Sequence, residues 1–214
     1  MHTWIKICGT TCLDDALASI AAGADALGFI FAESKRQVSP AQAQQIISQL
    51  PHSVERIGVF MNSTPEEIAQ IVGEVELTGI QMHGSESPAE VYKQLPADRR
   101  DAIRKIRTVL VRNDFSGKLK SDGSGQPTVD AWLLDSGAGS GQTFDWQAAR
   151  TQLNGSQNRF IIAGGLNPEN VGDAIDTFHP WGVDVVSGVE RELGRKDPEK
   201  LKAFVAAVRK AEKI

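Results

Sequence analysis

Two segments near opposite ends of the chain carry residues that could do chemistry. The apolar segment 4–8 ends in Cys8, and the apolar segment 160–163 is followed by Gly164 and Gly165. A cysteine thiolate can act as a base or a nucleophile, and the backbone N–H groups of a glycine pair can approach an anion closely. If both segments are strands, their ends predict a parallel-stranded barrel with a reactive face and a phosphate pocket.

Length and charge restrict the classes of partner. The chain has 214 residues and a formal net charge of −4 at pH 7, with 41% hydrophobic and 23% charged residues, which is typical of a globular protein that buries a sizeable core. The acidic balance argues against nucleic acid or an anionic membrane as a partner, because no excess of basic residues could neutralise phosphates. A small phosphorylated substrate is compatible, since a local pocket of N–H groups and one or two cations suffices.

Cysteine usage and hydropathy indicate the compartment. The two cysteines, Cys8 and Cys12, are expected to be one reactive and one buried thiol in a reducing cytosol rather than a disulfide. The pair is a poor metal site, because no cluster of histidines accompanies it. The N-terminus lacks the features of a signal peptide, and no apolar run approaches the roughly 18 residues of a membrane span. We therefore expect a cytoplasmic protein with no metal and no membrane attachment.

Strand-like and helix-like segments alternate along the chain. Strands are expected at residues 4–8, 26–31, 56–60, 79–82, 102–111, 129–135, 160–163 and 183–186. Helices are expected at 13–22, 40–50, from 64, at 88–95, from 145, at 168–178 and at 197–211. Repeated βα units imply a parallel sheet with helical crossovers. Eight units, without a Gly-x-Gly-x-x-Gly motif after the first strand, favour an α/β fold closed into a (β/α)8 TIM barrel over an open sheet. We expect residues 1–214 to form this single domain.

Helix signals vary in strength along the chain. Ser39 before Pro40 and Thr64 before Pro65 each combine an N-cap residue with a proline in the first turn of the helix. Residues 115–126 contain two lysines, three glycines and three serines. This composition predicts a loop or a degenerate fifth helix.

Sequence blocks at the successive strand ends form a series. The blocks are Lys6-Ile7-Cys8-Gly9, Gly28-Phe29-Ile30-Phe31 with Ser34 and Arg36, Gly58-Val59-Phe60-Met61-Asn62, Ile80-Gln81-Met82-His83-Gly84, Leu133-Leu134-Asp135-Ser136, Ala163-Gly164-Gly165-Leu166-Asn167-Pro168, and Gly182-Val183-Asp184 with Ser187-Gly188-Val189-Glu190. This series, in this order and over essentially the whole chain, closely resembles the phosphoribosylanthranilate isomerase family of tryptophan biosynthesis. Small departures are Met82 in place of the usual leucine, Val186 in place of a frequent serine, and Cys12.

The resemblance implies a reaction and a catalytic pair. The family converts N-(5-phosphoribosyl)anthranilate to 1-(2-carboxyphenylamino)-1-deoxyribulose 5-phosphate, an Amadori rearrangement that uses no cofactor and no metal. Cys8 would be the general base and Asp135 the general acid. A thiolate base requires the pKa of Cys8 to lie below its usual value of about 8.5, and Asp135 must hold a proton when substrate binds. Taken alone, Cys8 could also be a small buried apolar residue and Asp135 a loop anchor.

The resemblance also implies residues that bind substrate. Arg36, after the second strand, would hold the anthranilate carboxylate, for which the planar guanidinium is well suited. Lys35 beside it is expected to be a solvated surface cation. His83 and Asp184 lie at strand ends, and each could line the pocket or make only structural contacts. The phosphate would bind to residues of the seventh and eighth loops. These residues are Gly164, Gly165, Ser187 and Gly188.

Two other functions fit parts of the pattern. A related phosphosugar isomerase of histidine biosynthesis would use two carboxylates, whereas this chain offers Cys8 at the first strand end. A non-catalytic phosphometabolite-binding barrel would keep the glycines, but it would not need Cys8, Arg36 and Asp135 together. For the isomerase, Gly139 and Gly141 are expected to let the sixth loop close over substrate. The protein is expected to be a monomer or a homodimer.

Overall fold

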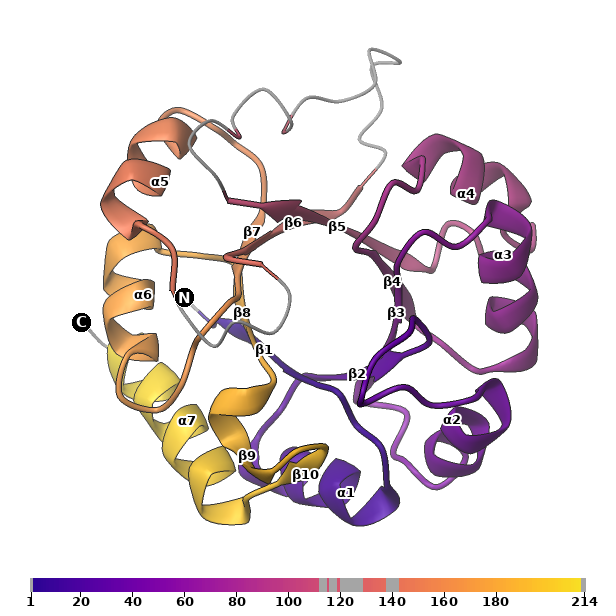
Figure 1. Cartoon of the computed structure of the whole chain (residues 1–214), viewed down its shortest axis with the longest axis horizontal. Helices are drawn as coiled ribbons and strands as arrows, with labels where there is room; N and C mark the ends of the chain where they lie inside the picture. The colour runs from indigo at the N-terminus through magenta and orange to yellow at the C-terminus, as the bar shows by residue number, and fades with distance from the viewer. Residues whose placement is uncertain (1, 112–114, 116–118, 120–128, 138–142, 213–214) are drawn as a thin grey trace.

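The chain forms a closed eight-stranded barrel of parallel strands with helices on the outside (Figure 1). This computed structural model describes residues 2–111, 115, 119, 129–137 and 143–212. The strands are β1 (Trp4–Cys8), β2 (Ala26–Ile30), β3 (Glu55–Phe60), β4 (Gly79–Met82), β5 (Arg104–Leu110), β6 (Ala131–Asp135), β7 (Phe160–Ile162) and β8 (Gly182–Val185). Each strand pairs in parallel with the next, and β8 pairs with β1. The predicted (β/α)8 barrel is confirmed.

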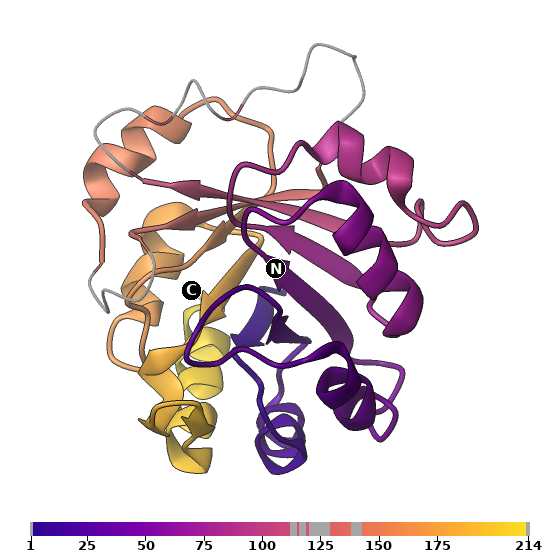
Figure 2. The ribbon, with the colours of Figure 1, turned by 45° about the vertical axis from the view of Figure 1, so that its right-hand side comes forward.

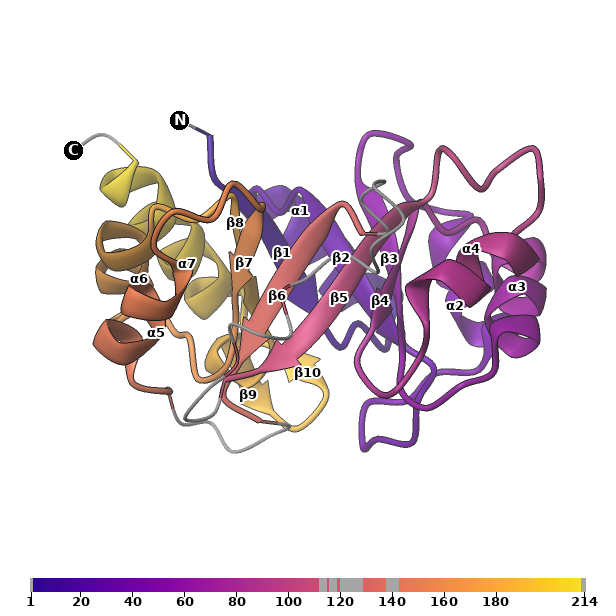
Figure 3. The ribbon, with the colours of Figure 1, turned by 90° about the horizontal axis from the view of Figure 1, so that it is seen from above.

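The helices cover the barrel in the predicted alternation. They are α1 (Leu13–Ala22), α2 (Pro40–Ile47), α3 (Pro65–Glu74), α4 (Pro88–Gln94), α5 (Trp146–Leu153), α6 (Val171–Phe178) and α7 (Pro198–Ala211). Views from two further directions show them outside the strands (Figures 2 and 3). The segment 115–126, predicted as a loop or a degenerate helix, lies outside the described residues apart from Phe115 and Leu119, and so do Gly139 and Gly141.

Helix starts follow the capping residues. The Ser39 and Thr64 side chains each accept a hydrogen bond from the backbone N–H of the third helical residue and complete a capping box, as their sequence signals predicted. The sixth helix begins at Val171 rather than at residue 168. The Asn167 side chain accepts hydrogen bonds from the backbone N–H groups of Glu169 and Asn170, which holds those residues in a turn before the helix.

Two apolar layers stabilise the barrel. The outer layer packs the strands against the helices, and the inner layer lies on the barrel axis. Because strand residues alternate between faces, Trp4, Lys6 and Cys8 of β1 all point inward. Trp4 stacks on Trp181, which precedes β8, with 4.9 Å between ring centroids, and the Arg104 guanidinium lies over both rings. This stack lies at the amino-terminal ends of β1 and β8.

The segment between β8 and α7 contains elements that the sequence analysis did not predict. A short 3-10 helix (Ser187–Val189) leads into an antiparallel hairpin of β9 (Glu190–Glu192) and β10 (Arg195–Lys196). The hairpin lies at the end of the barrel opposite the chain termini (Figure 3). Its strands are too short and too charged to show an alternating pattern.

Contacts with the first βα unit hold this hairpin in place. The Thr11 hydroxyl donates to the Gly194 carbonyl at 2.8 Å, and the backbone N–H of Lys196 donates to the Asp15 carboxylate at 3.0 Å.

None of the helices in the described part of the chain is both long and apolar enough to span a membrane. Over the same residues, no three His, Cys, Asp or Glu side chains gather as a metal site would require.

Candidate active site

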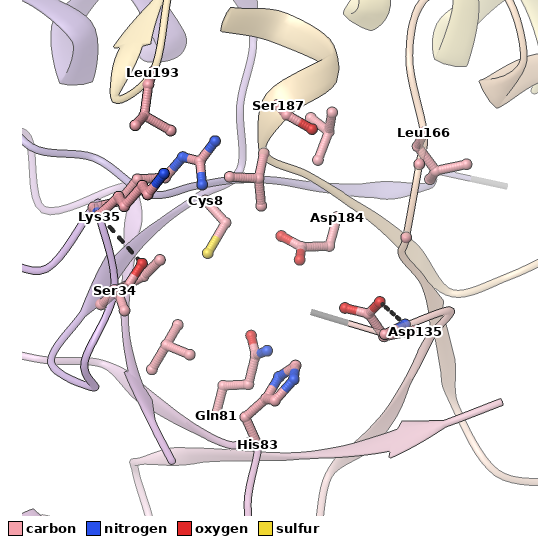
Figure 4. Close-up of a pocket in the computed structure, with 18 residues that line it drawn as sticks. Cys8, Ser34, Lys35, Gln81, His83, Asp135, Leu166, Asp184, Ser187 and Leu193 are labelled. Atoms are coloured by element: carbon pink, nitrogen blue, oxygen red, sulfur yellow. Dashed lines mark hydrogen bonds between the residues drawn. The ribbon is translucent and has the colours of Figure 1, made fainter. Parts of the chain in front are cut away.

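A pocket of about 490 Å³ opens at the carboxyl ends of the barrel strands (Figure 4). Most of the residues that the sequence singled out line it, namely Cys8, Arg36, His83, Asp135, Gly164, Gly165, Asp184 and Ser187. Gly188 is not part of the lining. The lining also contains residues to which the sequence analysis gave no role in the site, including Ser34, Lys35, Gln81, Leu166 and Leu193. Lys35, expected to be only a solvated surface cation, is exposed but belongs to the pocket rim.

Cys8 is the last residue of β1, and its side chain lies on the pocket floor. Gly28 is its partner on β2, and a Cβ added at Gly28 would lie 2.5 Å from the Cys8 sulfur. The missing side chain therefore makes the space that the sulfur occupies. The other thiol, Cys12, is free and half-buried at the N-cap of α1, outside this pocket.

The electrostatic environment of Cys8 differs from the expectation. Burial is the largest influence and raises the pKa of the thiol above its ordinary value, and the nearby Asp184 carboxylate adds to the increase. The Lys6 ammonium lowers the pKa of Cys8 but does not outweigh burial. The expected depressed pKa is therefore wrong for the free protein, in which the thiol is protonated at neutral pH.

Lys6 and Asp184 form a buried ion pair beside the thiol. The Lys6 Nζ donates to Asp184 Oδ1 at 2.8 Å, and their side chains are 0% and 6% exposed. Burial by itself would lower the pKa of Lys6, but Asp184 and Cys8 together raise it above the ordinary value. Lys6 is therefore a fixed cation in the barrel interior. The sequence alone could not assign this role, because the pairing joins β1 to β8.

Asp135 ends β6 and faces the pocket from a different side than Cys8 (Figure 4). Its Oδ1 accepts a hydrogen bond from the backbone N–H of Gly137 at 2.9 Å. A Cβ added at Gly164 would overlap the Ser136 hydroxyl and lie 3.0 Å from Asp135 Oδ1, and the φ of Gly164 is +79°. The loop after β7 therefore packs directly against the carboxyl group.

Two polar side chains of the fourth strand and its loop complete the pocket. Burial lowers the pKa of His83, and the Asp135 carboxylate is the main opposing influence, so the imidazole is neutral at pH 7. Gln81 is buried and donates to the Thr108 hydroxyl at 3.2 Å, while its Oε1 contacts no donor among the described residues. A polar residue inside an apolar strand was the signal in the sequence that could have singled out Gln81.

The glycine-rich ends of the seventh and eighth units lie side by side. Gly164 and Gly165 both have positive φ, and the Asn170 side chain donates to the Gly165 carbonyl at 3.0 Å. A Cβ at Gly188 would overlap the Leu166 carbonyl, so the two loops are in backbone contact. Ser187 lines the pocket beside this contact. The closely spaced backbones of these two loops are suited to binding an anion.

Arg36 reaches the pocket as part of an ion pair that the sequence did not reveal. Its Nε and Nη2 donate to the two carboxylate oxygens of Glu190 at 2.8 and 2.7 Å. Glu190 is 154 positions away and lies on the hairpin that was not predicted. Its hydrogen bonds are the largest cause of the raised pKa of Arg36.

Known proteins are similar to this chain in sequence and architecture. Residues 5–207 match the family model described as N-(5'phosphoribosyl)anthranilate (PRA) isomerase. The N-(5'-phosphoribosyl)anthranilate isomerase of Herminiimonas arsenicoxydans is 40% identical over 221 residues, which cover 99% of this chain and 95% of that relative. The crystal structure of phosphoribosyl anthranilate isomerase from Thermus thermophilus has a TM-score of 0.84 at 33% identity, covering 97% of this chain and 99% of that one.

A second solved structure contains a ligand. It is a phosphoribosyl anthranilate isomerase in complex with reduced 1-(o-carboxyphenylamino)-1-deoxyribulose 5-phosphate. Its TM-score is 0.79 at 37% identity, covering 98% of this chain and 100% of that chain. With the family model matched over residues 5–207, the chain belongs to the N-(5'-phosphoribosyl)anthranilate isomerase family.

Proposed function

We propose that this protein catalyses the Amadori rearrangement of N-(5-phosphoribosyl)anthranilate to 1-(2-carboxyphenylamino)-1-deoxyribulose 5-phosphate in tryptophan biosynthesis. The observation that carries the proposal is the placement of a thiol, Cys8, and a carboxyl group, Asp135, on different sides of one pocket. The rearrangement needs an acid and a base that act on different atoms of one small substrate, and a positioned acid or base contributes roughly 10²–10⁴-fold each.

Asp135 is the proposed acid. It gives a proton to the furanose oxygen, the ring opens, and the anomeric carbon becomes a Schiff base with the anthranilate nitrogen. The Gly137 N–H and the packing of Gly164 fix the direction of the carboxyl group.

Cys8 is the proposed base. As a thiolate it takes the C2′ proton of the Schiff base, which gives an enolamine that tautomerises to the ketone. Lys6 favours the thiolate electrostatically, and the space beside Gly28 fixes the position of the sulfur. Because the free thiol has a raised pKa, only a small fraction of Cys8 is ionised at neutral pH before substrate binds.

The two anionic ends of the substrate bind at opposite parts of the pocket. Arg36 is proposed to hold the anthranilate carboxylate, since a guanidinium offers a planar bidentate partner. Gly164, Gly165, Ser187 and the backbone near Gly188 are proposed to hold the phosphate. His83 and Asp184 are proposed to contact the ribose portion between these ends.

The test follows the loss of phosphoribosylanthranilate fluorescence with purified protein. Wild-type protein is expected to turn over substrate, and Cys8→Ser and Asp135→Asn are each expected to lower kcat by at least about 100-fold. Cys12→Ser and Asp176→Asn are matched controls, because these residues lie outside the pocket, and both should retain wild-type rates. Wild-type protein that binds substrate without turnover would instead favour a non-catalytic binding function.

A further inference from the structure

The Arg36 guanidinium is held along one edge and open along the other. Its contact with Glu190 uses Nε and one hydrogen of Nη2. A guanidinium has five N–H donors, so both Nη1 hydrogens and the second Nη2 hydrogen remain. No other acceptor among the described residues contacts them. The remaining edge has the geometry that a second carboxylate can accept in bidentate form.

Glu190 is itself fixed by contacts from three directions. Its side chain is 5% exposed and lies 3.3 Å from the Lys196 Nζ. The same Nζ donates to the carbonyls of Cys8 at 2.6 Å and of Val186 at 3.1 Å. The backbone carbonyl of Glu190 accepts from the Lys200 Nζ at 2.8 Å. The carboxylate that orients Arg36 is therefore tied to the backbone of the catalytic Cys8.

The Glu190 carboxylate is shared between two basic side chains. Burial by itself would raise the pKa of Glu190, but Arg36 and Lys196 lower it below the usual range, so Glu190 is ionised at neutral pH. Burial lowers the pKa of Lys196, and Glu190 opposes this. The three acceptors around Lys196 Nζ match the three hydrogens of an ammonium. The carboxylate is thus held between Lys196 and one edge of Arg36, and the other edge of Arg36 keeps its donors for a substrate carboxylate.

The aliphatic part of the Arg36 side chain is also held in place. A Cβ added at Gly9 would lie 2.8 Å from Arg36 Cδ, and Gly9 has a φ of +77°. The arginine stem therefore crosses the backbone directly after Cys8. Glu190 fixes the far end of the same side chain, so the guanidinium has little freedom to rotate away from the pocket.

We propose that Glu190 is a positioning residue that holds the open edge of Arg36 toward the pocket and thereby makes the enzyme select substrates whose aromatic ring carries a carboxylate. The proposal rests on the proposed function. Glu190 acts only through Arg36 and does not touch the reacting atoms. Its removal should therefore weaken recognition of the carboxylate and leave recognition of the phosphate and the sugar intact.

The experiment compares two stable ligands. One is reduced 1-(2-carboxyphenylamino)-1-deoxyribulose 5-phosphate, and the other is its analogue with phenyl in place of 2-carboxyphenyl. Fluorescence titration gives both Kd values for wild type, Glu190→Gln and Glu190→Asp. The preference of wild type for the carboxylate ligand is expected to fall by about ten- to a hundredfold in both variants, since a hydrogen-bonded charge is lost or displaced. The Kd of the phenyl analogue is expected to stay within about twofold.

Glu192→Gln is the matched control, because it removes the same charge from an exposed position of the same strand. It should retain the wild-type preference. Glu190→Asp keeps the buried negative charge that Lys196 needs, so it decides the question if Glu190→Gln does not fold. Wild-type preference in both Glu190 variants would overturn the proposal. So would equal binding of the two ligands by wild type, and turnover of the substrate by that same protein would leave the proposed function standing.

Discussion

Cys8 and Lys6 point the same way from β1, because side chains two positions apart in a strand share a face. Lys6 therefore brings a positive charge close to the thiol. Asp184 nevertheless takes the closest contact of Lys6, at 2.8 Å, and offsets much of its charge. Burial consequently decides the sign of the shift at Cys8. A buried base of this kind is protected from solvent but is ionised only in part.

The raised pKa of Cys8 predicts how activity depends on pH. Since the thiolate is the active form, kcat/KM should increase with pH through an apparent pKa above about 8.5. The measurement is kcat/KM of wild type from about pH 6 to about pH 10. The rate of Cys8 alkylation by iodoacetamide in Cys12→Ser should follow the same curve. An activity that is already maximal at pH 7 would contradict the prediction.

At the scale of elements, the hairpin of β9 and β10 links the last βα unit of the barrel to the first. It follows β8, its Glu190 pairs with Arg36 of the pocket, and the backbone N–H of its Lys196 donates to Asp15 of α1. Asp15 accepts from the backbone N–H of Lys196 and is buried. A helix of the first βα unit thus sets the position of a segment that belongs to the last.

Asp15→Ala should loosen this attachment. The variant leaves the buried N–H of Lys196 without its acceptor, so the free energy of unfolding should fall by about 1–3 kcal/mol. KM should rise more than kcat falls, because the hairpin carries the partner of Arg36. Steady-state kinetics and urea unfolding check both effects. Asp14→Ala removes an exposed acid from the same helical turn and serves as the control. If both variants change KM equally, the hairpin attachment is not the cause.

The elements differ in how well the sequence predicts them. The eight barrel strands were predicted because each holds a group of apolar residues between turn or helix signals, although β5 mixes them with Arg104, Lys105 and Arg107. The helices α2 and α3 were predicted from their capping residues. The sequence also predicted that Cys8, Asp135 and the glycines at strand ends lie at the same end of the barrel, since parallel strands bring their carboxyl ends together. The ion pairs of Arg36 and of Lys6, and the raised pKa of Cys8, depend on distant segments and on burial, which local patterns do not contain.

At the scale of the whole molecule, contacts between the chain ends support the closure of the barrel. The backbone N–H of Thr3 donates to Glu212 Oε1 at 2.6 Å, and Arg209 donates to the Thr3 carbonyl at 2.8 Å. Arg209 also contacts Glu212 at 2.5 Å. The last helix is thereby fastened to the segment that enters the first strand.

Glu212→Gln should destabilise the protein in a pH-dependent way. Burial by itself would raise the pKa of Glu212, but Thr3 and Arg209 lower it below its ordinary value. Its contribution is therefore present above the unfolded pKa of about 4.3 and is lost as pH falls through the lower folded pKa. Urea unfolding should show a loss of about 1–3 kcal/mol at pH 7, and this difference should shrink as the pH falls below the unfolded pKa of about 4.3.

Glu199→Gln provides the comparison for this variant. Glu199 is 83% exposed, and its side chain forms a surface ion pair with Lys202, so its loss should change the free energy of unfolding by less than about 1 kcal/mol. A difference between wild type and Glu212→Gln that persisted unchanged in acid would show that the carboxylate charge is not what holds the chain ends together.

The stack of Trp4 on Trp181 spans the junction between the first strand and the last. One indole belongs to β1 and the other immediately precedes β8, so the rings meet only when these two strands are paired. Two indoles with centroids 4.9 Å apart are close enough to couple their electronic transitions, so we expect a circular dichroism couplet that is lost when the rings separate. The intensity of this couplet should therefore report whether β1 and β8 are paired. The signal comes from the end of the barrel opposite the active site and needs no attached label.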